Sequence, residues 1–282
     1  MVNVSEEDRE NSRTRAWGKS TIPVYTKYIL FARRVHRFIK PRPITIRLNG
    51  KSFTILGNLE YLLFLSKYYE PNTYKIFDRF LDPNYSYIDI GAFIGSTVLY
   101  SAYLAKKAYA IEPDPIAFKE LQKNVILNPM LQGKIEMHQK CLYIRSEKVK
   151  FGSMSKGGDS MSSLLFADSR TSWFVDGITF PEFIRENNIT DCNFIKMDIE
   201  GGELIVLPSM QDYLEKEKPI LYLSMHPHFF KDPKNDTKKI IDVLRIYKNI
   251  YTDGGKKIEL NDLLTEKRIK KRYAILATDK KW

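Results

Sequence analysis

One stretch constrains the fold more than any other: residues 85–115, which read YSYIDIGAFIGSTVLYSAYLAKKAYAIEPDP. An apolar run ends in Asp89 and Gly91, Gly95 follows, and a helical run then leads to a second apolar run that ends at Glu112. Strand, glycine turn, helix and strand in this order predict a βαβ unit with parallel strands. A sheet of this kind holds its ligand beyond the carboxyl ends of its strands, which is where the two glycines lie.

The same alternation continues along the rest of the chain. Strands are expected at 85–90, 107–111, 134–139, 193–198, 219–225 and 272–277. Helices are expected near 59–69, 73–81, 95–104, 115–127, 180–187 and 201–214, and residues 148–170 are less regular. The sequence therefore predicts an α/β fold, with a doubly wound, mostly parallel sheet covered by helices on both faces.

The N-terminal part of the chain is predicted to be an extension of this fold. Apolar residues recur at helical spacing over 24–39, and the opposite face of that helix is basic. Residues 44–56 predict a β-hairpin whose tight turn is formed by Asn49-Gly50. We therefore expect a basic extension over residues 1–57 and the main domain over residues 58–282.

The glycine turn indicates what kind of ligand the sheet holds. The dinucleotide fingerprint G-x-G-x-x-G is absent because position 93 is Phe, so a nucleoside without a pyrophosphate fits better. Glu112 is placed to accept hydrogen bonds from two ribose hydroxyls. These features favour S-adenosylmethionine. The residues predicted to bind it are Asp89, Gly91, Ala92, Phe93, Gly95, Glu112 and Pro113.

A second group of polar residues follows two later strands. In NFIKMDIEGGELIVLPSM, residues 193–210, Asp198 and Glu200 point the same way because strand side chains repeat every two residues. The next strand leads to His226 and His228. We expect Asp198, Glu200 and His226 to lie near the mouth of the ligand site, while His228 is as readily explained by packing.

Three segments, YIDIGAFIG, AIEPDP and FIKMDIEGGELIVL, together resemble the FkbM family of S-adenosylmethionine-dependent methyltransferases. The resemblance implies a class I methyltransferase fold, Rossmann-like, with seven strands of which the last is antiparallel. It also implies O-methylation of a sugar, a glycan or a similar hydroxyl. Lys196, Asp198 and Glu200 would then lie at the reaction mouth. The family usually has Asn where this chain has Phe93.

Methylation of a hydroxyl needs a group that removes its proton, because a sugar hydroxyl is a weak acid. We expect His226 or Asp198 to act as the base, with Lys196 or Glu200 orienting it. As an alternative, Asp198, Glu200 and His226 hold a divalent metal ion, since oxygen ligands with one imidazole suit Mg²⁺ or Mn²⁺. No metal is part of the main prediction.

The net charge of +11 belongs to the two ends of the chain. Residues 11–51 carry eleven Lys or Arg and no acid, residues 266–282 are net +5, and residues 52–265 are net −2. Nucleic-acid methylation is therefore the alternative function rather than the main one, and a non-catalytic binding protein is a third. The basic helix 24–39 is expected to dock its apolar face on the protein's own core, and the alternative is that its basic face contacts anionic lipid. With no apolar leader and two unpaired cysteines, a cytoplasmic location is expected.

Overall fold

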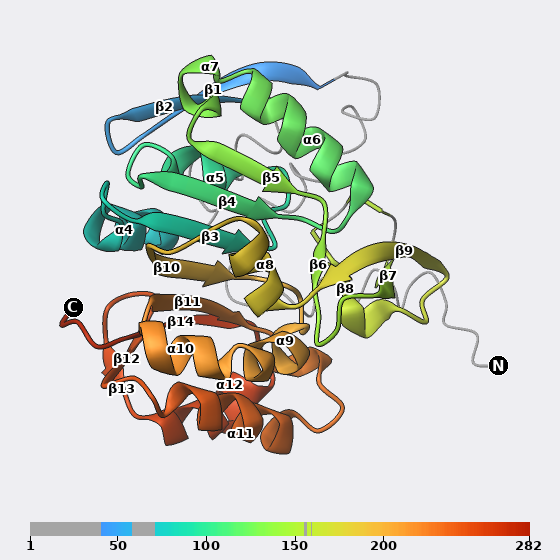
Figure 1. Cartoon of the computed structure of the whole chain (residues 1–282). Coiled ribbons are helices and arrows are strands. Elements are labelled where there is room, and N and C mark those ends of the chain that lie inside the picture. Colours follow the sequence, from blue (N-terminus) through green and yellow to red (C-terminus); the bar gives the residue numbers. More distant parts are fainter. Residues whose placement is uncertain (1–40, 58–70, 155–156, 159) are drawn as a thin grey trace, which may run out of the picture.

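The computed structural model describes residues 41–57, 71–154, 157–158 and 160–282. Its centre is a sheet with the strand order β13-β12-β14-β11-β10-β3-β4-β5 (Figure 1). The strands are β3 Ser86–Ile90, β4 Lys107–Ile111, β5 Ile135–His138, β10 Cys192–Met197, β11 Ile220–Met225, β12 Asn249–Thr252, β13 Lys257–Ile258 and β14 Tyr273–Thr278. Neighbours from β5 to β11 are parallel, whereas β14 runs antiparallel between β11 and β12. The predicted α/β sheet with an antiparallel last strand is confirmed.

Six of these strands lie where the alternation predicted them, to within one or two residues. Strands β12 and β13 were not predicted. The described residues contain eight strands in this sheet, whereas the family resemblance implies seven. The additional strand is β13, a two-residue edge strand paired with β12. It is too short to leave a periodic pattern in the sequence.

The helices cover both faces of the sheet, because the inward residues of each strand alternate between two cores. Ile88, Ile195 and Leu221 belong to the core under α8, α9, α10 and α11, whereas Tyr87 and Phe194 belong to the core under α4, α5 and α6. The bounds are α4 Pro71–Phe80, α5 Ser96–Ser101, α6 Pro115–Ile126, α7 Pro129–Gln132, α8 Phe180–Glu186, α9 Glu203–Ser209, α10 Gln211–Glu217, α11 Pro233–Leu244 and α12 Glu266–Ile269. The predicted helix 201–214 is two helices that meet at Met210, and α11 was not predicted.

A second, smaller sheet lies beyond the carboxyl ends of β3, β4 and β10 (Figure 1). Its strands are β6 Cys141–Leu142, β7 Lys148–Ser153, β8 Ser162–Ser163 and β9 Thr171–Ile178, in the order β6-β9-β7-β8. The region predicted to be irregular, 148–170, thus contains β7 and β8, followed by the short 3-10 helix Leu164–Phe166. The sheet has a small core of its own, formed by Cys141, Val149, Phe151 and Val175.

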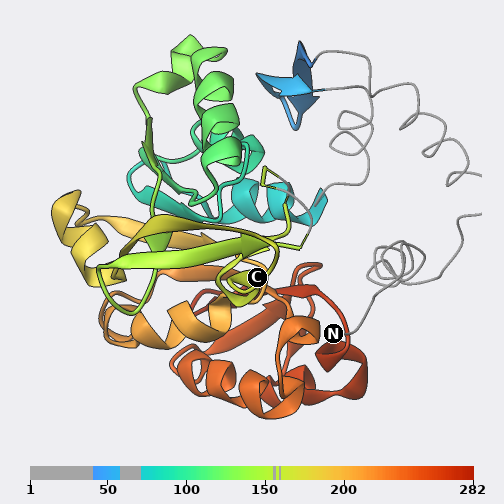
Figure 2. The ribbon, with the colours of Figure 1, turned by 90° about the vertical axis from the view of Figure 1, so that its right-hand side faces the viewer.

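The predicted hairpin is present as β1 Arg42–Leu48 and β2 Lys51–Gly57, and both turn residues, Asn49 and Gly50, have positive φ. It packs on α6 and on the connection to α7. The side-chain oxygens of Asn124 on α6 and of Asn128 before α7 accept from the N–H groups of Leu56 and Thr54. Figure 2 shows the hairpin on the outer side of α6. The predicted helices 24–39 and 59–69 lie outside the described residues. No helix in the described ranges is both long enough and apolar enough to cross a membrane.

Candidate active site

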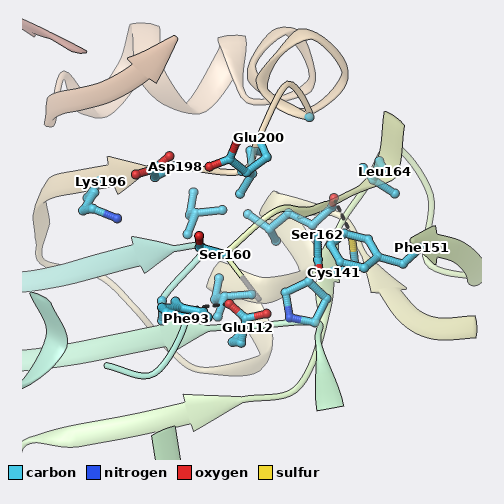
Figure 3. A pocket seen from close by; sticks show the side chains of 18 of the residues that line it. Phe93, Glu112, Cys141, Phe151, Ser160, Ser162, Leu164, Lys196, Asp198 and Glu200 are labelled. Carbon is cyan, nitrogen blue, oxygen red and sulfur yellow. Dashed lines mark hydrogen bonds between the residues drawn. The ribbon is translucent and has the colours of Figure 1, made fainter. Parts of the chain in front are cut away.

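A pocket of about 370 Å³ lies beyond the carboxyl ends of β3, β4 and β10, between the main sheet and the small sheet. One side is formed by the turn after β3 and by Glu112, and the opposite side by Asp198 and Glu200 (Figure 3). Phe151, Ser162 and Leu164 of the small sheet and its connection cover it. The small sheet thus closes a site that the main sheet alone would leave open.

The turn after β3 brings the backbone close to the neighbouring strand. Gly91 and Gly95 have φ of 85° and 90°, and a Cβ on Gly91 would lie 2.0 Å from the backbone oxygen of Asp198. Between them Phe93 has φ of 50°, a left-handed conformation that Asn adopts more readily than Phe. Phe93 thus keeps a left-handed turn without an amide side chain.

Glu112 is held at the pocket wall by two backbone groups. One carboxylate oxygen accepts from the N–H of Phe93 at 2.7 Å and the other from the N–H of Asp114 at 2.8 Å. Burial raises the pKa of Glu112 to about 7, and these two hydrogen bonds only partly oppose that effect. Each oxygen can accept a further hydrogen bond, so the side chain is fixed in place and still able to bind a ligand.

Asp89 and Lys196 form a buried ion pair across β3 and β10. Lys196 Nζ lies 3.2 Å from Asp89 Oδ1, and both side chains are almost fully buried. The hydroxyls of Tyr87 and Thr97 donate to the other oxygen of Asp89. Lys196 lines the pocket and Asp89 does not, so the carboxylate holds the lysine from behind.

Three side chains predicted for the reaction mouth meet at the far side of the pocket. His226 Nε2 lies 3.5 Å from Asp198 Oδ1 and 3.5 Å from Glu200 Oε2. Asp198 and Glu200 line the pocket, whereas His226 is completely buried behind them. One ligand atom from each of the three lies within 4.8 Å of the others, the arrangement of a group that could hold a metal ion.

Two residues that sequence reasoning missed fix this group. Glu203 Oε1 accepts from the backbone N–H of His226 at 2.7 Å and lies 3.2 Å from His226 Nδ1. Arg272 Nη2 donates to Asp198 Oδ2 at 3.0 Å. A signal for Arg272 existed: an antiparallel last strand brings its amino end to the carboxyl ends of the parallel strands. Glu203 stands three residues after Glu200 in EGGE, the segment already singled out.

The charges at this end shift the pKa values in opposite directions. Burial raises the pKa of Asp198, but the positive charges of Arg272, Lys196 and His226 outweigh it and hold that pKa well below its usual range. Burial raises the pKa of Glu200, with the Asp198 charge adding to the effect. Burial lowers the pKa of His226, and the carboxylates of Glu203 and Glu200 more than reverse this.

The predicted residues thus divide into those that face the pocket and those that stand behind it. The pocket is lined by Gly91, Ala92, Phe93, Glu112, Pro113, Lys196, Asp198 and Glu200. Three predicted residues do not line it. Asp89 holds Lys196, Gly95 shapes the turn, and His226 contacts the carboxylates of Asp198 and Glu200. His228 is not part of the metal-like group, although its ring centre lies 6.0 Å from that of His226.

The strand order with β14 antiparallel, and a pocket at the carboxyl ends of the parallel strands, define the class I methyltransferase fold. The methyltransferase FkbM domain matches residues 89–251, more than half of the chain. The chain belongs to the FkbM methyltransferase family. No curated protein has a significant match to the sequence.

Three of the solved structures that resemble this one illustrate the likeness. An FkbM methyltransferase from Methylobacillus flagellatus is 18% identical with a TM-score of 0.47, and the match covers 70% of this chain but 44% of that one. Precorrin-6y C5,15-methyltransferase from Geobacter metallireducens is 12% identical with a TM-score of 0.41, covering 75% and 87%. Methanocaldococcus jannaschii Trm5, solved with adenosine, is 16% identical with a TM-score of 0.38, covering 86% and 57%.

Proposed function

We propose that this enzyme transfers the methyl group of S-adenosylmethionine to a hydroxyl oxygen of a sugar, a glycan or a similar small molecule. The observation that carries the proposal is the polarity of the pocket. Glu112 stands on one side of the pocket, where it would accept from ribose, and the carboxylates of Asp198 and Glu200 stand on the other (Figure 3). His226 lies behind these two carboxylates.

The donor would bind along the turn after β3. Its ribose hydroxyls would donate to Glu112, whose orientation is already set by the N–H groups of Phe93 and Asp114. Gly91 and Ala92 give the donor a wall without bulky side chains. The volume of about 370 Å³ falls in the range of small-molecule sites, which is roughly 300–1,000 Å³.

The reaction itself asks little of the protein. A bound donor would supply an electrophilic methyl group, and its sulfur would keep the electron pair of the broken carbon–sulfur bond. The acceptor hydroxyl would lose its proton to a carboxylate as its oxygen attacks the methyl carbon. The enzyme therefore needs an in-line approach and a base at the acceptor oxygen.

Asp198 and Glu200 line the pocket, so an acceptor hydroxyl can reach both carboxylates. Because the pKa of Asp198 is lowered and that of Glu200 is raised, Glu200 is the better proton acceptor of the two. His226, which was one of the two expected bases, lies behind them and acts on their position and charge. Lys196 lines the same wall and is held by Asp89, which suits a role in orienting the acceptor.

The proposal is tested with the purified enzyme and S-adenosylmethionine that carries a labelled methyl group. Glycans, lipid-linked sugars and total RNA from the source cells are offered as separate acceptors, and the label is followed by mass spectrometry. We expect the label on glycan or sugar hydroxyls. Label on RNA, with none on the sugar fractions, would overturn the acceptor and favour the nucleic-acid alternative.

A further inference from the structure

We propose that Asp198, Glu200 and His226 form a binding site for one divalent cation of the Mg²⁺ or Mn²⁺ class. The inference deepens the proposed function, because the same wall of the pocket would hold the acceptor hydroxyl. It rests on the contacts of the two carboxylate oxygens of Asp198 and the two ring nitrogens of His226, and on the backbone conformation of Glu200.

The spacing of the three side chains suits a single ion. His226 Nε2 lies 3.5 Å from one oxygen of Asp198 and 3.5 Å from one oxygen of Glu200. With metal–ligand bonds of about 2.1 Å, two ligand atoms at right angles lie about 3 Å apart and two on opposite sides about 4 Å. The observed separations fall between these limits.

The atoms that face the centre of this group are the ones without hydrogen bonds. Asp198 Oδ1 and His226 Nε2 are buried polar atoms for which the described residues supply no hydrogen-bond partner. An unsatisfied buried polar atom costs roughly 1–3 kcal/mol, so two of them facing one point call for a ligand. A cation between them would satisfy both.

The opposite atoms of the same side chains are already occupied. Arg272 donates to Asp198 Oδ2, and Glu203 faces His226 Nδ1 at 3.2 Å. A carboxylate on the far nitrogen of a histidine is the arrangement that fixes metal-binding imidazoles, since it leaves the lone pair of the near nitrogen for the ion. Phe229 stacks on the His226 ring at 14° and holds its plane.

Glu200 reaches the group through an unfavourable backbone conformation. Its φ is 51°, in the left-handed region that residues other than glycine rarely adopt, and Gly201 follows with φ of 95°. Backbone strain of this kind costs about 1–3 kcal/mol and is characteristic of functional sites. Here it turns the chain directly after β10 and brings the carboxylate opposite His226.

An ion at this point would act on the acceptor. Three protein ligands leave other coordination positions free, and Asp198 and Glu200 lie on the pocket wall. A hydroxyl bound to a divalent cation loses its proton more readily. Glu200 would bind the ion through one oxygen and keep the other to receive that proton, so the base and the ion are compatible.

The test measures metal binding apart from methyl transfer. The full-length enzyme, stripped with a chelator, is titrated with Mn²⁺ while the signal of free Mn²⁺ is followed by electron paramagnetic resonance. We expect one site, competition by Mg²⁺, and at least tenfold weaker binding in both Glu200→Gln and His226→Gln. Glu203→Gln should weaken binding about 10–100-fold, as loss of an outer partner does. Asp242→Asn, which changes an exposed carboxylate on α11, is the control and should bind as the wild type does.

Thermal melting of each variant checks that it is folded. No Mn²⁺ binding by the wild type, or equal binding by all variants, would overturn the metal site. Calorimetry with S-adenosylhomocysteine on the same samples separates the two proposals. If the donor analogue binds and Mn²⁺ does not, the metal site is wrong and the proposed function stands. If Mn²⁺ binds and the donor analogue does not, the proposed function is wrong and the metal site stands.

Discussion

A Cβ added to Gly91 would lie 2.0 Å from the backbone oxygen of Asp198, so the turn after β3 and the residue after β10 touch through their main chains. Gly91→Ala should therefore lower the free energy of unfolding by more than about 1 kcal/mol, because it combines a clash with a positive φ of 85°. Thermal melting measures this. Two glycines with no atoms near an added Cβ serve as controls. Gly133→Ala adds neither a clash nor backbone strain, and Gly50→Ala, with φ of 76°, adds backbone strain alone. If all three variants melt alike, the contact with Asp198 is unimportant.

The buried pair of Asp89 and Lys196 should be sensitive to loss of one charge. Asp89→Asn leaves Lys196 in a buried position with one charge partner fewer, at a cost of about 3–5 kcal/mol in the free energy of unfolding. Denaturant unfolding measures it. The matched control is Asp176→Asn in the exposed pair with Lys148, where the cost should stay within about 1 kcal/mol. A small effect at Asp89 would mean that its hydroxyl partners, Tyr87 and Thr97, hold the site without the charge.

Glu112 should make donor binding depend on pH. Its pKa is raised from 4.5 to about 7, and a protonated carboxyl cannot accept from both ribose hydroxyls. The affinity for S-adenosylhomocysteine should therefore rise as the pH increases through 7, and binding below 7 should release a proton. In Glu112→Gln the affinity should fall roughly tenfold or more and lose this pH dependence. Calorimetry in two buffers of different ionisation enthalpy follows both, with Glu147→Gln as an exposed control.

The same shift affects the stability of the free protein. Because the folded pKa of Glu112 exceeds the unfolded one, the folded state binds more protons between 4.5 and about 7. Its contribution to stability is thus present at low pH and is lost as the pH rises through 7. Glu112→Gln should flatten that part of the stability curve, and an unchanged curve would contradict the raised pKa.

Asp198→Asn should leave donor binding nearly intact and reduce turnover on the true acceptor by about a hundredfold or more. The substitution keeps the shape but removes the charge that takes a proton or holds an ion. Turnover under saturating donor measures this, and calorimetry confirms that the donor still binds. Full activity would show that Asp198 has neither role.

Contact of the N-terminal extension with a membrane stays a proposal, and truncation of the extension can test it. Residues 11–51 carry eleven cations and no acid, and each cation near an anionic bilayer contributes about 1 kcal/mol. We expect the intact protein to sediment with anionic vesicles, and a protein without residues 1–40 to remain folded and stay in solution. If the intact protein ignores the vesicles and the truncated one melts earlier, the segment docks on the enzyme instead.

The sequence predicted the parts of the site that follow from strand ends. Glu112 and Asp198 come at the ends of apolar runs, and parallel strands bring such ends to one edge. Contacts between segments far apart in the sequence could not be predicted from it. The small sheet over the pocket pairs β6 with β9 across more than thirty residues, and two of its strands, β6 and β8, have only two residues each, too few to show a period.

The position of His226 behind the carboxylates was equally hidden. The sequence places His226 directly after β11, at the carboxyl edge of the sheet, but it does not show that the side chain lies behind the pocket wall. Depth is decided by Glu203, which accepts from both its backbone and its ring. Phe93 is a different case: nothing in its residue type announces the left-handed turn that it adopts.

The position of Arg272 just before β14 has a consequence for synthesis on the ribosome. The chain is made from its N-terminal end, so Asp198 emerges more than seventy residues before Arg272. Arg272 supplies the cation that pairs with Asp198. The nascent chain therefore carries Asp198 without this counter-charge until the start of β14 has been added.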